Sequence, residues 1–237
     1  THGVDAQGRP ITSSKSTSGG LTLTDQGLGA NVGHSKTDQA GTTRSVTGGV
    51  TVDAKGNTSV EAGYGMSGKS GSGVKTTFRA GHQVDAGDPV EVPPGGVFEV
   101  SYSVSDTRGV GVGGSASRTS TGPSVGATVG TSSAATQSGV RRFTSKAEAT
   151  RFKENAAALL ALGGSEKAPT SVEGALAIPV GETRGSGETE GSNWGVSASY
   201  GATIGYGQQK STSHQLAVRR VSEQLVDVTA VVSRDKV

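Results

Sequence analysis

The sequence contains no cysteine, and it has few apolar and aromatic residues. Without cysteine the chain has neither disulfide bonds nor thiolate metal sites. Hydrophobic residues make up 31% of the chain and aromatic residues 4%, whereas an ordinary globular domain is nearer half apolar, so we expect no thick side-chain core. No apolar run approaches the roughly 18 residues that a membrane-spanning helix needs. Any membrane role would therefore depend on β-strands.

The chain also lacks a strong charge of either sign. Its net charge is +2, and 18% of its residues are charged. Nothing in this balance favours a nucleic-acid partner. Disordered chains usually combine low hydrophobicity with high net charge, and the second property is missing, so we expect a folded chain. The first residues, Thr1-His2-Gly3, include no Met, which is typical of a processed form or of a piece of a longer protein.

Glycine is abundant, with 39 residues, and one glycine-rich stretch matches a nucleotide-binding motif. The P-loop pattern G-x-x-x-x-G-K-[ST] is met at Gly63, Gly68, Lys69 and Ser70. A P-loop needs a buried strand before it and a helix beginning at its lysine. Here Ser70-Gly-Ser-Gly73 follows the lysine, and no helix would begin with these residues. We therefore expect strand and turn glycines, and no nucleotide.

Residues 1–90 are predicted to form a Gly-rich antiparallel β region. Its clearest unit is Val50–Val60, in which alternating residues lead into and out of a turn that contains Asp53 and Gly56. Asp begins turns through its side chain, and Gly supplies the positive φ of a hairpin loop. This pattern predicts a β-hairpin.

Residues 91–143 are predicted to form one long hairpin that turns near Gly122. Apolar residues occupy even positions up to residue 116 and odd positions after the turn. An even-length loop at 121–122 or 120–123 would bring both apolar sets to one face. It would pair residue 116 with 127 and residue 114 with 129.

Residues 144–163 differ in kind, because they predict an amphipathic helix at about 144–162. Ser145 and Glu148 fit a capping box, and two glycines end the segment. The apolar stripe consists of Ala149, Phe152, Ala156, Leu159 and Leu160. The pattern favours a helix that packs on a sheet over one that lies on a membrane.

After a polar stretch at 164–190, interpreted as a linker, residues 191–237 are predicted to form a second β-hairpin block. Trp194 to Tyr206 alternates large and small residues without a break, which predicts one strand. Its two aromatic ends would be about 40 Å apart along the strand, or about 28 Å across a bilayer at a tilt near 45°. This height is close to the hydrocarbon thickness of a membrane.

Half-buried strands of any soluble antiparallel sheet also alternate. The face opposite the apolar residues is unusual, however, because it carries Gly and Ser over long uncharged runs. Such a face suits the water-filled lumen of a barrel, a closely stacked second sheet, or a Gly/Ser-rich fibrous adhesin.

The pattern of Val110–Val129 and of Trp194–Tyr206 resembles the membrane-inserting stem hairpins of β-barrel pore-forming toxins. The chain differs from constitutive outer-membrane barrels, which have fuller aromatic girdles. The resemblance implies a secreted protein that forms homo-oligomers and inserts into a lipid membrane, with several strands of each subunit in a shared barrel.

The predicted fold is thus mainly β, with long antiparallel Gly/Ser-rich amphipathic hairpins and one helix. The expected function is that of a membrane-inserting or pore-forming subunit. The alternative is an extracellular structural or adhesive protein at a bacterial cell surface, and an enzyme comes third. No catalytic, cofactor or metal residues are expected, because the four histidines are isolated. The membrane-facing candidates are Val110, Val112, Val125, Ala127, Val129, Trp194, Val196, Ala198, Tyr200, Ala202, Ile204 and Tyr206.

Overall fold

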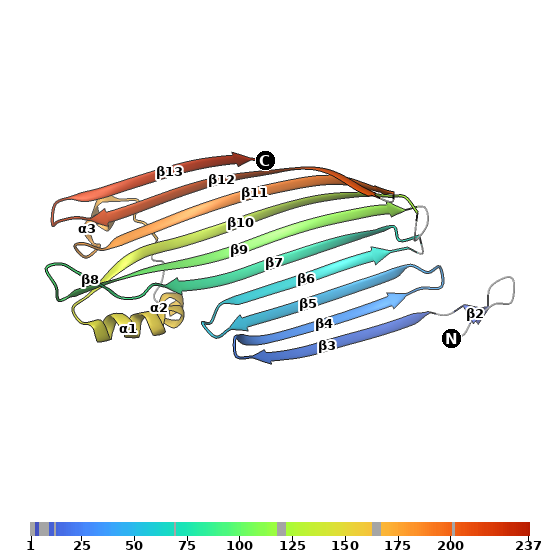
Figure 1. Ribbon diagram of the computed structural model, residues 1–237, viewed down its shortest axis with the longest axis horizontal. Helices are drawn as coiled ribbons and strands as arrows, with labels where there is room; N and C mark the ends of the chain where they lie inside the picture. Colours follow the sequence, from blue (N-terminus) through green and yellow to red (C-terminus); the bar gives the residue numbers. More distant parts are fainter. Residues whose placement is uncertain are drawn as a thin grey trace.

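The computed structural model describes residues 3–4, 10–11, 13–68, 70–117, 122–162, 167–200 and 202–237. The chain is mainly β, as predicted, and forms one large antiparallel sheet with three short helices (Figure 1). The strands of this sheet are β3 (Ser14–Thr24), β4 (Gly27–Thr37), β5 (Thr43–Asp53), β6 (Thr58–Ser67), β7 (Gly73–Ala86), β8 (Val90–Val92), β9 (Val97–Ser117), β10 (Ser124–Phe143), β11 (Thr183–Tyr200), β12 (Ala202–Arg220) and β13 (Val226–Lys236). Two further strands, β1 (Gly3–Val4) and β2 (Pro10–Ile11), pair with each other.

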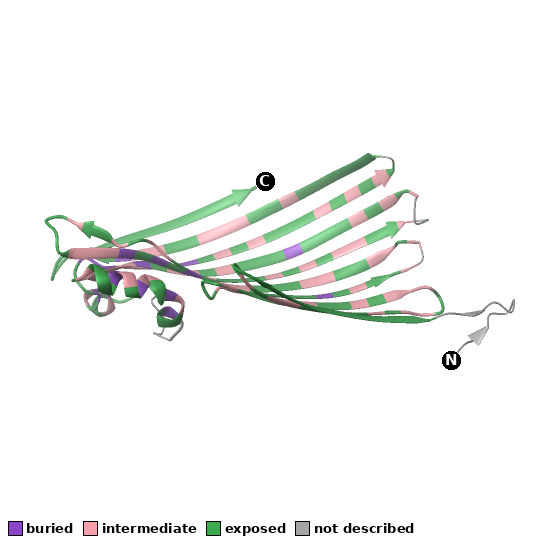
Figure 2. Ribbon diagram, turned by 60° about the horizontal axis from the view of Figure 1, so that its bottom comes forward, coloured by how far each residue is buried: buried purple, intermediate pink, exposed green. Residues whose placement is uncertain are grey.

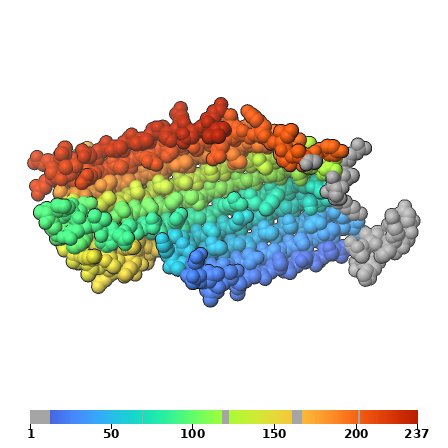
Figure 3. Space-filling view, viewed as in Figure 1, coloured from blue at the N-terminus to red at the C-terminus, as the bar shows by residue number. Residues whose placement is uncertain are grey.

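The strand order follows the chain. From one edge to the other it is β13-β12-β11-β10-β9-β7-β6-β5-β4-β3, and the short β8 pairs with β9. The space-filling view shows these strands side by side in chain order as one continuous slab (Figure 3). The sheet is not closed into a barrel, so it has two edges. One is β3, and the other is β13 beside Lys210–Arg220 and β12 itself over Ala202–Gln208.

The three helices lie near one end of the sheet and cover one of its faces (Figure 2). They are α1 (Lys146–Glu154), α2 (Ala156–Leu162) and α3 (Val172–Leu176). The main core lies under α1 and α2, where Phe152 and Ala149 pack against Val100, Tyr102 and Val104 of β9. A smaller cluster joins Ala168, Ala175 and Ile178 to Val218 of β12. Among the described residues, every buried hydrophobic side chain belongs to one of these two clusters.

The predicted helix is present but divided. Ser145 is the N-cap, and its hydroxyl accepts a hydrogen bond from the Glu148 backbone N–H at 3.2 Å, as the sequence predicts. Asn155 ends α1, because its side-chain amide donates to the Arg151 carbonyl, and α2 begins at the next residue. Leu159, predicted in the buried stripe, is instead 46% exposed.

The hairpin of β9 and β10 is confirmed, but its predicted register is wrong by two residues. Ala116 pairs with Val125, and Gly114 pairs with Ala127. Both apolar sets still lie on one face, because a shift of two residues preserves the alternation. The sequence alone does not distinguish registers that differ by two.

The polar stretch interpreted as a linker contains regular secondary structure. It contains α3, and its residues from Thr183 onward form the first part of β11. In this part Gly185 and Gly187 alternate with polar residues such as Arg184 and Glu188. Because neither side of the strand is apolar, no hydrophobic period marks it.

Candidate functional site

All twelve predicted membrane-facing residues lie on the same face of the sheet. They belong to the adjacent strands β9, β10, β11 and β12, and the backbone pairs join Val112 to Val129, Val129 to Trp194, and Val196 to Tyr206. All twelve side chains are exposed. The structure therefore assembles these residues into one continuous exposed surface.

The prediction that Trp194 to Tyr206 forms one strand is wrong. Tyr200 pairs with Ala202, so β11 and β12 are the two strands of a hairpin. Residue 201 lies outside the described residues. The rings of Trp194 and Tyr206 are neighbours, with centroids 5.5 Å apart, rather than the two ends of a strand. The paired residues Tyr200 and Ala202 are two apart in sequence, so the alternation continues through the reversal and conceals it.

The same exposed apolar surface continues over strands for which the sequence analysis named no membrane-facing residues. Following the backbone pairs from β9 to β3 keeps to the same face. The additional residues on these strands are Leu21, Leu23, Leu28, Ala30, Val32, Val46, Val50, Val52, Val60, Ala62, Tyr64, Met66, Val74 and Phe78, and Ala116 of β9 joins them. Together with the twelve predicted residues they are called the apolar belt, which spans nine strands. The alternation of apolar with small or polar residues along β4, β5 and β6 is the sequence signal that could have identified their belt residues.

The apolar belt is strongly exposed. Leu21 and Leu23 are 81% and 82% exposed, and Tyr200 and Ile204 are 80% and 78% exposed. Single exposed apolar residues are normal on proteins, but large contiguous patches mark contacts with a membrane, a ligand or another protein. The belt is thus the main candidate site of the chain.

The opposite side of the belt strands is called the polar face, and it is built from Gly, Ser and Thr. Hydroxyl groups pair across its strands, as between Thr51 and Ser59 at 2.7 Å. Opposite the belt, its charged residues are Glu61, Lys75 and Arg79, and Arg79 lies 3.2 Å from the Glu61 carboxylate. Lys75 lies between Gly65 and Gly113 on the neighbouring strands. The sheet therefore has two chemically distinct faces.

A polar zone separates the belt from the helix-covered end on the belt face. On β7 and β9 it includes His82 and Asp106, whose Nδ1 and Oδ1 atoms are 2.8 Å apart. On β11 and β12 it is wider and includes Glu188, Glu190 and Lys210. The belt is therefore not an extension of the buried core under α1.

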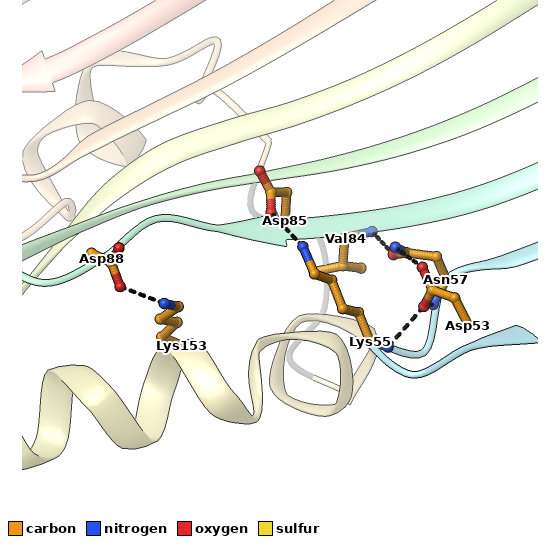
Figure 4. Close-up of polar contacts among 7 residues, drawn as sticks. All are labelled: Asp53, Lys55, Asn57, Val84, Asp85, Asp88 and Lys153. Atoms are coloured by element: carbon orange, nitrogen blue, oxygen red, sulfur yellow. Dashed lines mark hydrogen bonds and ion pairs between the residues drawn. The ribbon is translucent and has the colours of Figure 1, made fainter. Parts of the chain in front are cut away.

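A network of polar contacts lies at the β5–β6 turn (Figure 4). Asp53 accepts hydrogen bonds from the backbone N–H groups of Lys55 and Asn57, at 2.8 and 2.9 Å, and from the Asn57 amide. The Oδ1 atom of the Asn57 side chain accepts a hydrogen bond from the Val84 backbone N–H of β7 at 2.6 Å. Nearby, Lys153 of α1 forms an ion pair with Asp88. These contacts fasten turns and a helix to the sheet, and they do not resemble a catalytic arrangement.

Acidification is expected to destabilise the fold through Asp53 and Asp88. The hydrogen bond from the Asn57 backbone N–H lowers the pKa of Asp53, and the hydrogen bond from Lys153 lowers the pKa of Asp88. A depressed carboxyl pKa stabilises the fold above the unfolded pKa, about 4, and this contribution disappears as pH falls through the folded value. Thermal unfolding followed by circular dichroism should show a midpoint that falls between pH 5 and pH 3. The Asp53→Asn/Asp88→Asn variant should lose part of this fall, and Asp235→Asn should keep it.

The P-loop match lies in a strand and a turn. Gly63 is in β6, Gly68 and Ser70 are in the β6–β7 turn, and β7 begins at Gly73. Lys69 lies outside the described residues. A phosphate-binding P-loop is followed by a helix, whereas a strand follows here. This geometry supports the prediction that the chain does not bind a nucleotide, which stays a prediction.

Other functional signals are few. Among the described residues, no group of three or more His, Asp or Glu side chains is arranged to hold a metal ion. No described helix is long and apolar enough to span a membrane. The sequence matches no protein-family model, and no curated protein is significantly similar to it. The two faces of the sheet are therefore the features of the chain that bear on its function.

Proposed function

We propose that this chain is a subunit of a secreted, membrane-inserting β-barrel or pore, in which the apolar belt contacts lipid. The observation that carries the proposal is the pairing of a contiguous exposed apolar belt with a polar face of Gly, Ser and Thr across nine strands. Membrane barrels place apolar side chains outward and small or polar ones inward, with the same alternation on every strand. A soluble sheet has no comparable reason to expose Leu, Ile and Val on this scale.

The hydrogen bonding of the strand backbones supports the same proposal. A strand can lie in hydrocarbon only if its N–H and C=O groups pair with neighbouring strands. Within the belt, seven of the nine strands pair on both sides among the described residues. The exceptions are β3, an edge strand, and the belt part of β12, because β13 pairs only with Lys210–Arg220. Because the sheet is open, a closed wall needs further strands, and other copies of this chain are the proposed source. The helix-covered end would remain in water.

The belt has a height that a bilayer can accommodate. The stretches Val46–Val52, Val60–Met66 and Trp194–Tyr200 each have seven residues, which span about 20 Å along a strand, or about 16 Å across a bilayer when the strands tilt by about 35–40°. The apolar band of outer-membrane barrels is about 25 Å tall. Lysine side chains flanking the belt can reach the interface with their amines, and a bilayer thins locally around a shorter span.

An extracellular structural or adhesive protein is the second candidate, and the two edge strands favour it. β3 and β13 present backbone groups that could pair with other copies to extend the sheet. Glycines on the polar face would also let a second sheet approach closely. In such an assembly protein, rather than lipid, would cover the belt.

Vesicle leakage separates the two candidates. The parent chain should release a trapped dye from phospholipid vesicles, and negative-stain images should show rings on those vesicles. The measurement should cover a range of pH and protein concentration, because assembly depends on both. Filaments or sheets without dye release at any condition would contradict the pore and support the structural protein.

A further inference from the structure

We infer that the apolar belt crosses the sheet obliquely and that the bilayer plane follows it, so that the strands traverse the membrane at about 35–40° from its normal. The inference rests on the proposed function and adds an orientation to it. The occupant of the belt is the hydrocarbon of a lipid bilayer. Two residues are called level here when a row of backbone pairs perpendicular to the strands joins them.

One row of level residues begins polar and ends apolar. It runs from Lys15 on β3 through Lys36 and Arg44 to Ala127 on β10 and Tyr206 on β12. Three cations thus lie side by side at one end of the row. A bilayer perpendicular to the strands would place these cations at the same depth as Ala127 and Tyr206. Charged side chains in hydrocarbon are costly, so this orientation is unfavourable.

A second row has the opposite gradient. It runs from Leu23 and Leu28 on β3 and β4 through Asp106 on β9 to Glu188 on β11 and His214 on β12. Its apolar end lies at β3 and its charged end at β11 and β12. Taken together, the two rows show that the belt moves along the strands as it crosses the sheet.

The size of this movement gives an angle. Thr22 is the centre of the apolar stretch Leu21–Leu23 on β3, and the residue level with it on β12 is Ser213. The apolar stretch of β12 is centred on Ile204, nine residues away. The two strands are eight steps apart in the sheet, so the belt shifts by slightly more than one residue per strand. With a rise of about 3.3 Å per residue and about 4.8 Å between strands, this shift corresponds to about 35–40°.

The angle agrees with the geometry of closed barrels, although it comes only from side-chain pattern and register. Strands of transmembrane barrels tilt by about 35–45°. A soluble sheet has no bilayer plane to which its apolar residues must conform. When the strands are tilted in this way, Lys15, Lys36 and Arg44 lie at one interface of the membrane. Glu188 and Glu190 lie beyond the other interface, on the side of the helices.

Depth measurements on single-cysteine variants test the orientation, and the chain has no native cysteine to interfere. The variants Leu23→Cys, Ala62→Cys, Ala127→Cys and Ile204→Cys carry an environment-sensitive fluorophore. Quenching is compared between phosphatidylcholine vesicles with a nitroxide deep in the acyl chain and vesicles with one at the headgroup. All four labels should report the same deep position. Strands perpendicular to the membrane would separate Leu23 and Ile204 by about 30 Å in depth.

The matched controls are Thr17→Cys and Gln208→Cys, which are both level with Val112. The oblique belt places both labels near the headgroups, at opposite interfaces, and leaves a label at Val112→Cys deep. Equal depth for these three labels would overturn the inference while leaving the proposed function intact. No quenching of any label by either lipid would overturn both.

Labelled variants that release dye less well than the parent would not report the native depth, so the unmodified chain provides a second measurement. Polarised infrared spectroscopy of the parent in oriented bilayers should give a mean strand tilt of about 35–40°. A tilt near zero would overturn the inference without any substitution.

Discussion

Replacement of Ala127 by Arg is expected to abolish dye release from vesicles. Ala127 lies in the middle of the apolar belt on β10, where its side chain is exposed and pairs with Gly114 and Val196. Arg at the midplane of a membrane barrel costs about 2–4 kcal/mol. This cost is a factor of about thirty to a thousand for each inserted copy, and in the proposed pore several copies share one barrel.

The neighbouring substitution Thr128→Arg is the matched control. Thr128 lies on the polar face of the same strand, between Gly113 and Gly195, which leave space for a long side chain. In a water-filled lumen this charge costs little, so dye release should continue. Added cations in the lumen should also shift the ion selectivity of single channels toward anions. Equal loss of release in both variants, with both chains folded, would contradict the assignment of the two faces.

Alternation let the sequence predict which residues share a face, but it did not predict how the strands are aligned. All twelve candidates from Val110 to Tyr206 lie on one face. The face on which a residue lies depends only on whether its position along its own strand is odd or even. The register error at Ala116 and the hidden reversal after Tyr200 have one cause. A register shift of two residues and a reversal between Tyr200 and Ala202 both leave the alternation of large and small residues unbroken, so the sequence pattern reveals neither.

The oblique course of the belt was beyond prediction for a related reason. The levels of Lys15 and Tyr206 are linked through seven intermediate strands, and each backbone pairing contributes to the result. One register error would have changed the apparent tilt. The first part of β11 was missed because Gly185 and Glu188 give no hydrophobic period, although β10 and β12 enclose that strand on both sides.

The helix was the easiest element to predict, because its signals are local. Ser145 and Glu148 specify its start, and Phe152 marks the face that packs on the sheet. The belt and this core lie on the same face of the sheet, yet they differ in what covers them. Phenylalanine occurs in both places, which allows the same substitution to probe each.

Phe152→Ala is expected to lower the free energy of unfolding in water by about 3–5 kcal/mol. Phe152 is 4% exposed, and its ring lies 6.1 Å from that of Tyr102 and 5.3 Å from that of Phe143. Truncation leaves a cavity between α1 and the sheet that the neighbouring rings cannot fill. Urea unfolding followed by circular dichroism measures the loss.

Phe78→Ala should behave in the opposite way. Phe78 lies in the apolar belt on β7, level with Ala62 and Val110, and is 51% exposed. Its removal in water should change the unfolding free energy little, because exposed surface substitutions usually stay within about 0.5 kcal/mol. In a membrane the lost burial of a large apolar side chain costs about 1.5–3 kcal/mol, so association with vesicles should weaken at least tenfold. A variant that unfolds as easily as Phe152→Ala, or that binds vesicles as tightly as the parent, would place Phe78 in a protein core rather than against lipid.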